Sequence, residues 1–83
     1  MAKCLIADDS KVIRMILSKI MSNLKYDIIE AEDGEEVVEL CETEEPHLII
    51  MDTKLPILEG LDAMYKIREM QRIKQPKIIF CSS

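Results

Sequence analysis

The chain has 83 residues, of which 48% are hydrophobic and 33% charged, and its formal net charge is −5. This composition predicts one folded domain rather than a disordered segment, and the aromatic fraction of 4% predicts an aliphatic core. The negative charge argues against nucleic-acid binding, and the apolar runs are far shorter than the roughly 20 residues of a membrane span.

The first two predicted elements are a strand and a helix. Residues 3–7 form an apolar run without alternation, which indicates a strand buried on both faces. Apolar side chains then recur at helical spacing over residues 13–24, and either Asp9 or Ser10 can cap the helix that they predict. The methionines, Met15 among them, mostly occupy inward positions, where we expect them to fill the core.

Two further predicted strands flank a second helix. Residues 26–31 predict a more polar strand near a sheet edge, and residues 33–36 resemble a capping box at the start of a helix. Pro46 ends that helix. Residues 47–51 are apolar throughout, so they predict a third buried strand, which runs directly into Asp52.

The remaining residues predict a loop, a third helix and a last strand. Residues 53–59 form the loop, and Gly60 precedes a helix with apolar side chains on one side. Residues 75–76 break this helix, and residues 77–81 predict the fourth strand. Strands that alternate with helices predict an α/β fold with a parallel sheet and right-handed crossovers. No segment indicates a second domain.

Carboxylates follow two of the predicted strands. Asp8 and Asp9 come after the first strand and Asp52 after the third. In parallel sheets functional groups gather beyond the carboxyl ends of the strands, so these side chains converge if the two strands are neighbours. A bound cation relieves their repulsion, and oxygen-only ligands suit Mg²⁺. His47, the only histidine, falls at the opposite end of its strand, which argues against a zinc or Ser-His-Asp site.

The three cysteines predict a reduced protein. Cys4, Cys41 and Cys81 form no CxxC pair, and they cannot all pair with one another. No secretory signal precedes them, so we expect a cytoplasmic location. Without a nearby histidine these thiols have no activating base, and we expect Cys4 and Cys81 to pack in the core.

Four segments, spread from the first strand to the last residue, form one recognisable pattern. They are Leu5-Ile-Ala-Asp-Asp-Ser-Lys-Val-Ile-Arg14, Glu30-Ala-Glu-Asp-Gly-Glu-Glu36, Asp52-Thr-Lys-Leu-Pro-Ile-Leu-Glu-Gly60 and Pro76-Lys-Ile-Ile-Phe-Cys-Ser82. Together these segments resemble the receiver domain of two-component response regulators. The resemblance implies a flavodoxin-like parallel sheet with strand order 2-1-3-4 and (βα)3β topology.

The resemblance also implies a role for each site residue. Asp52 would be the phosphoacceptor, and its donor would be a histidine kinase or a histidine phosphotransfer protein. Asp8 and Asp9 would hold Mg²⁺ together with an Asp52 oxygen and the main-chain carbonyl of Lys54. Ser82 would donate its hydroxyl to a phosphoryl oxygen. The protein would be a signalling phosphoacceptor rather than an enzyme.

The sequence departs from the family pattern after the fourth strand. A complete receiver has five strand–helix units, so residues 1–83 would be an incomplete receiver that lacks the fourth helix, the fifth strand with its following lysine, and the fifth helix. Residues 77–81 would then be an exposed edge strand, and we expect a homodimer through this edge or through exchange of elements. Lys11, Arg14 and Lys19 would form either a docking face for the donor or a solvated helix face.

Two other functions compete with the phosphoacceptor hypothesis. One is a receiver-like binding module that works without phosphorylation, which the missing lysine favours. The other is a Mg²⁺-dependent phosphatase with Asp52 as nucleophile. The phosphatase is disfavoured because Lys54 stands where such enzymes place a second acid.

Overall fold

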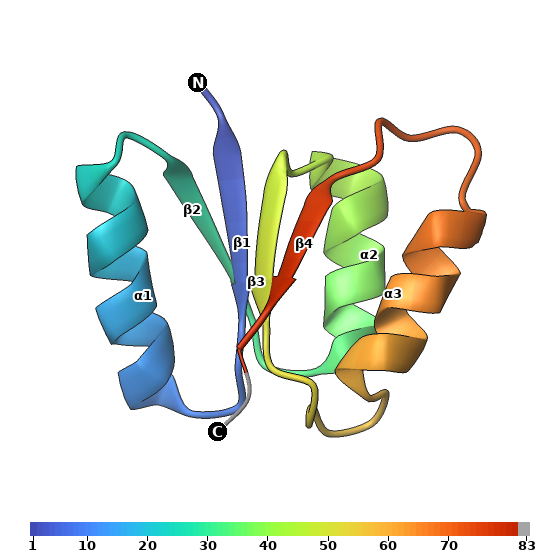
Figure 1. Cartoon of the computed structure of the whole chain (residues 1–83), viewed down its shortest axis with the longest axis horizontal. Coiled ribbons are helices and arrows are strands. Elements are labelled where there is room, and N and C mark those ends of the chain that lie inside the picture. Colours follow the sequence, from blue (N-terminus) through green and yellow to red (C-terminus); the bar gives the residue numbers. More distant parts are fainter. Residues whose placement is uncertain (82–83) are drawn as a thin grey trace.

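The computed structural model describes residues 1–81. Strands and helices alternate along the whole of this range, in an arrangement of one sheet between two helical layers (Figure 1). Within it no helix is long and apolar enough to cross a membrane. The elements are β1 (Lys3–Ala7), α1 (Lys11–Asn23), β2 (Asp27–Ala31), α2 (Gly34–Glu44), β3 (Leu48–Met51), α3 (Gly60–Glu69) and β4 (Lys77–Phe80).

The four strands form one parallel sheet in the order β2-β1-β3-β4. This order confirms the α/β, flavodoxin-like arrangement expected from the sequence, with β2 at an edge and β1 beside β3. Ala7, the last residue of β1, pairs with Met51, the last residue of β3. The residues that follow these two strands therefore leave the sheet side by side.

The helices divide between the two faces of the sheet. Figure 1 shows α1 on one face and α2 with α3 on the other. A hydrophobic cluster lies on each face of the sheet, and successive residues of β1 point into different clusters. Leu5 packs in the cluster with α2 and α3, and Ile6 packs in the cluster with Met21 of α1. Both β1 side chains are fully buried, which confirms that this apolar run is a strand covered on both sides.

Side-chain caps define where the first two helices begin. Ser10 Oγ accepts from the Ile13 N–H at 3.3 Å, so Ser10 rather than Asp9 caps α1. At the start of α2, Asp33 Oδ1 accepts from the Glu36 N–H at 2.8 Å, as the sequence predicts.

The expectation that Cys81 packs in the core is wrong. β4 ends at Phe80, one residue earlier than predicted, and Cys81 is exposed just beyond it. The other two thiols, Cys4 in β1 and Cys41 in α2, are fully buried. Burial therefore depends on whether the residue lies within an element that has a covered face.

A second expectation that fails concerns the apolar side of α1. Met15, expected in the core, is 61% exposed, and Ile16 and Ile20 are about half exposed. The reason is the position of the helix, which contacts β1 and β2. On this face of the sheet no described helix covers β4, whose Ile79 is 51% exposed. An apolar surface on α1 and β4 is thus left open to solvent.

Candidate functional site

Three aspartates converge beyond the carboxyl ends of β1 and β3. Each of Asp8, Asp9 and Asp52 offers one carboxylate oxygen, and these atoms all lie within 4.8 Å of one another. Asp8 and Asp52 are buried, whereas Asp9 is exposed. The structure thus confirms the convergence that the two strand ends predict, with one carboxylate at the solvent side of the cluster.

Asp8 is held by three hydrogen bonds from different directions. Its N–H donates to the Ala31 carbonyl of β2 at 3.2 Å. Its Oδ1 accepts from the Ser10 N–H at 2.8 Å, and its main-chain carbonyl accepts from Arg14 Nη1 at 2.6 Å. These contacts fix the backbone and one carboxylate oxygen of Asp8, and they leave its second carboxylate oxygen available to a ligand.

Asp52 is fixed in a similar way. Its N–H donates to the Ala7 carbonyl at 3.0 Å, and its Oδ1 accepts from the Lys54 N–H at 3.0 Å. Gly60 lies directly against this backbone, because a Cβ on Gly60 would come within 2.4 Å of the Asp52 carbonyl oxygen. The Gly60 N–H also donates to the Thr53 carbonyl at 2.9 Å. The start of α3 therefore packs onto the backbone of Asp52.

The loop between β3 and α3 contains a tight turn. The Pro56 carbonyl accepts from the Leu58 N–H at 2.7 Å and from the Gly34 N–H at 3.3 Å. Ile57, between these turn residues, has φ of 69° and is 75% exposed. Such a turn is rare and strained for a β-branched residue. The conformation of the loop is therefore stabilised by its contact with the first residue of α2, and not by the backbone preference of Ile57.

The donor set fits a small hard cation. Mg²⁺ binds oxygen ligands at about 2.0–2.1 Å, so two oxygens on the same ion lie roughly 3–4 Å apart. The three aspartate oxygens need only a small contraction to reach that spacing, or waters can bridge the gap. No ion pair among the described residues involves these carboxylates. Their negative charge is therefore left for a cation to balance.

Of the two remaining predicted site residues, Lys54 and Ser82, the structure describes only Lys54. Lys54 lies at the site, where its N–H contacts Asp52 and its side chain is exposed. Ser82 lies outside the described residues.

Arg14 does not lie on an exposed helix face, although both interpretations of the sequence, a docking face and a solvated face, placed it on one. It is buried at 7% exposure, and its guanidinium pairs with Glu30 at 3.1 Å and with Glu32 at 3.4 Å. The sequence does carry a signal for this placement. Arg14 precedes the half-buried Leu17 by three residues and the buried Met21 by seven, which is the spacing of one helix face.

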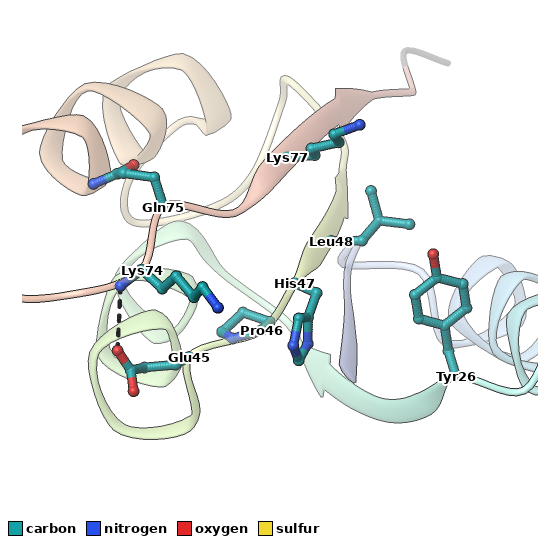
Figure 2. Close-up of a pocket in the computed structure, with 8 residues that line it drawn as sticks. All are labelled: Tyr26, Glu45, Pro46, His47, Leu48, Lys74, Gln75 and Lys77. Atoms are coloured by element: carbon teal, nitrogen blue, oxygen red, sulfur yellow. Dashed lines mark hydrogen bonds between the residues drawn. The ribbon is translucent and has the colours of Figure 1, made fainter. Parts of the chain in front are cut away.

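A cavity of about 370 Å³ lies at the end of the sheet opposite to the aspartate cluster. Its lining includes His47, which is placed just before β3 and accepts a hydrogen bond at Nδ1 from the Lys3 N–H at 3.0 Å. This confirms that the single histidine is remote from Asp52. Figure 2 shows the eight residues that line the cavity: Tyr26, Glu45, Pro46, His47, Leu48, Lys74, Gln75 and Lys77.

The two buried thiols are unsuited to nucleophilic chemistry. Burial raises the pKa of Cys4 from 9.0 to about 11. Burial also raises the pKa of Cys41 to about 11. Both thiols are therefore protonated at neutral pH, whereas a nucleophilic cysteine needs its thiolate.

Comparison with known proteins agrees with this geometry. The family model of the response regulator receiver domain matches residues 4–83. The transcriptional regulatory protein PdtaR of Mycobacterium tuberculosis is 46% identical over 66 residues, which are 78% of this chain and 32% of that protein. The alkaline phosphatase synthesis transcriptional regulatory protein PhoP of Bacillus subtilis is 38% identical over 69 residues, covering 83% and 29%. The chain thus spans about a third of the curated relatives that it matches.

Solved structures show the same fold. The chemotaxis response regulator CheY4 of Vibrio cholerae superposes with a TM-score of 0.89 at 29% identity, over 96% of this chain and 67% of that one. A chain in the co-crystal structure of the Saccharomyces cerevisiae histidine phosphotransfer protein Ypd1 with the receiver domain of Ssk1 gives a TM-score of 0.81 at 28% identity, over 98% and 61%. The parallel sheet, the aspartate cluster and the family match together show that this chain belongs to the response regulator receiver domain family.

Proposed function

We propose that this chain is a signalling phosphoacceptor in which Asp52 receives a phosphoryl group with the help of Mg²⁺. The observation that supports this most strongly is the meeting of Asp8, Asp9 and Asp52 within 4.8 Å at the ends of two adjacent strands. Asp52 is buried and backbone-anchored, so one of its oxygens is held in a constant direction. A fixed nucleophile beside a cation site is what phosphoryl transfer requires.

In the proposed reaction the free Asp52 oxygen attacks the phosphorus of a phosphohistidine. The O–P bond forms while the N–P bond breaks, and the departing imidazole takes up a proton. Mg²⁺, held by Asp8, Asp9, Asp52 and the Lys54 main-chain carbonyl, would supply the positive charge that an anionic nucleophile and an anionic donor need in order to approach. The hydroxyl of Ser82 would donate to a phosphoryl oxygen.

The proposed donor is a histidine kinase or a histidine phosphotransfer protein. Its support is the family match and the superposition on a receiver solved with such a phosphotransfer protein. In this proposal residues 1–83 belong to one receiver domain that works in the cytoplasm, which agrees with the three free thiols. The chain accepts a phosphoryl group and passes on a signal, without turnover of a substrate.

We further propose that a second copy of the chain pairs with β4. The Lys77 N–H donates to the His47 carbonyl just before β3 at 3.0 Å, and the Cys81 N–H donates to the Met51 carbonyl of β3 at 2.9 Å. Because strand groups alternate in direction, the N–H groups of Ile78 and Phe80 point away from β3. No described strand occupies that edge. Antiparallel pairing about a twofold axis would bring Ile79 of each copy together, which would cover part of the open apolar surface.

Incubation with a small phosphodonor tests the proposed function, with and without Mg²⁺. We expect a stable single modification that chelation of Mg²⁺ prevents and that Asp9→Asn weakens. A chain that stays unmodified would instead indicate a binding module, and sustained release of phosphate would indicate a phosphatase. Either of these results would contradict the proposal. Asp27→Asn, the same exposed change at the opposite end of the sheet, is the control for a general charge effect.

A further inference from the structure

We propose that Arg14 is a positioning residue for the metal site, an inference that rests on the proposed function. Arg14 Nη1 donates to the Asp8 carbonyl at 2.6 Å. That carbonyl belongs to the peptide unit that joins Asp8 to Asp9, the two residues that supply carboxylates from the β1 end. A guanidinium that fixes this peptide sets the direction in which both side chains leave the backbone.

Two glutamates, one on β2 and one just beyond it, accept hydrogen bonds from the other nitrogens of Arg14. Its Nε donates to Glu30 at 3.1 Å and its Nη2 donates to Glu32 at 3.4 Å. A guanidinium whose donors were not engaged elsewhere would readily form a two-pronged pair with a carboxylate. Because its other donors are engaged by the two glutamates, Arg14 contacts a neutral carbonyl of the site and leaves the aspartate oxygens to the cation.

The positioning role and a simple charge effect predict opposite changes in Mg²⁺ affinity when Arg14 is removed. If Arg14 acted only as a nearby positive charge, its removal would tighten Mg²⁺ binding, because like charges repel. If it acted only in the stability of the fold, its removal would leave the Mg²⁺ affinity of the folded chain unchanged. Positioning predicts weaker binding, of about tenfold, which is the lower end of the effect of removing groups that orient metal ligands.

The test is Mg²⁺ titration of the 83-residue chain, followed by NMR shifts of the amides around Asp9 and by calorimetry. Arg14→Met keeps the aliphatic stem and removes all three donated hydrogen bonds, so we expect a roughly tenfold higher dissociation constant. Unchanged or tighter binding by Arg14→Met would overturn the inference.

Arg68→Met is the matched control. Arg68 also donates to a main-chain carbonyl, that of Pro76 at 2.9 Å, but it lies on α3 and not at the aspartate cluster. We expect this variant to keep the wild-type Mg²⁺ affinity. If Arg14→Met does not fold, Arg14→Lys decides: it keeps the charge but cannot reach three acceptors in the fork geometry of arginine, and affinity equal to wild type would contradict positioning. Failure of the wild-type chain to bind Mg²⁺ would instead contradict the proposed function.

Discussion

The junction of α2 with the loop after β3 predicts that Gly34→Ala destabilises the protein. Gly34 is the first residue of α2, and helix propensity alone would favour alanine there by up to about 1 kcal/mol. Packing points the other way. A Cβ at this position would lie 1.8 Å from the Leu58 carbonyl oxygen and 2.7 Å from its carbonyl carbon, so the loop backbone must move.

That movement also breaks a hydrogen bond. The Gly34 N–H donates to the Pro56 carbonyl at 3.3 Å, and losing such a bond costs about 0.5–1.5 kcal/mol. Overpacking adds about 1–3 kcal/mol. After the gain in propensity is subtracted, we expect the free energy of unfolding to fall by about 1–3 kcal/mol. For a domain of this size each kcal/mol lowers the midpoint temperature by roughly 4–8 °C.

Urea unfolding followed by far-UV circular dichroism measures the effect of Gly34→Ala. Glu39→Ala, an exposed change in the same helix, is the control, and it should stay within about 0.5 kcal/mol of wild type. Equal or higher stability of Gly34→Ala would refute the reasoning, because it would mean that helix propensity outweighs the contact with the loop.

Four further predictions concern the turn, the reactivity of the thiols, the pH dependence of stability and the β4 edge. Ile57→Gly should raise stability by about 1 kcal/mol in the same urea assay, because glycine adopts positive φ without strain; a loss of stability would contradict this. At pH 8 an alkylating reagent should modify Cys81 rapidly and Cys4 and Cys41 only on unfolding, as counted by mass spectrometry; three equally fast thiols would contradict the burial. Because burial raises the pKa of both buried thiols from 9.0 to about 11, the unfolded chain loses protons first, so their contribution to stability is complete below about pH 9 and is lost as the pH rises through 11. Sedimentation velocity should show dimers that Ile79→Lys disrupts, whereas a concentration-independent monomer would contradict pairing through β4.

Much of the fold is predictable from the sequence because short periodic patterns encode it. The apolar run 3–7 has no polar alternation, and it is indeed the strand covered on both faces. Asp8 and Asp52 directly follow two such runs, and parallel strands place their carboxyl ends at one edge. The aspartate cluster therefore follows from the order of elements, without knowledge of any side-chain contact.

The expectations that proved wrong concern the burial of individual side chains. Burial depends on which elements cover each surface. Spacing along α1 marks Ile16 and Ile20 as apolar positions, but it does not say whether a neighbouring element lies over them, and both are about half exposed. Arg14 shows the opposite error. Its charge indicated a solvated or docking face, yet it is buried because Glu30 and Glu32, which are remote in the sequence, neutralise it. The spacing of Arg14 from Leu17 and Met21 marks the inward face of α1, but the pairing with the two glutamates is not visible in a local pattern.

The measurement that tests the central claim most directly is intact-mass spectrometry after treatment with a small phosphodonor and Mg²⁺, with the wild type and Asp52→Asn compared side by side. This substitution keeps the size of the side chain and removes the nucleophilic carboxylate. If Asp52 is the phosphoacceptor, the wild type gains one phosphoryl group and Asp52→Asn gains none. Equal modification of both proteins would contradict the assignment of Asp52.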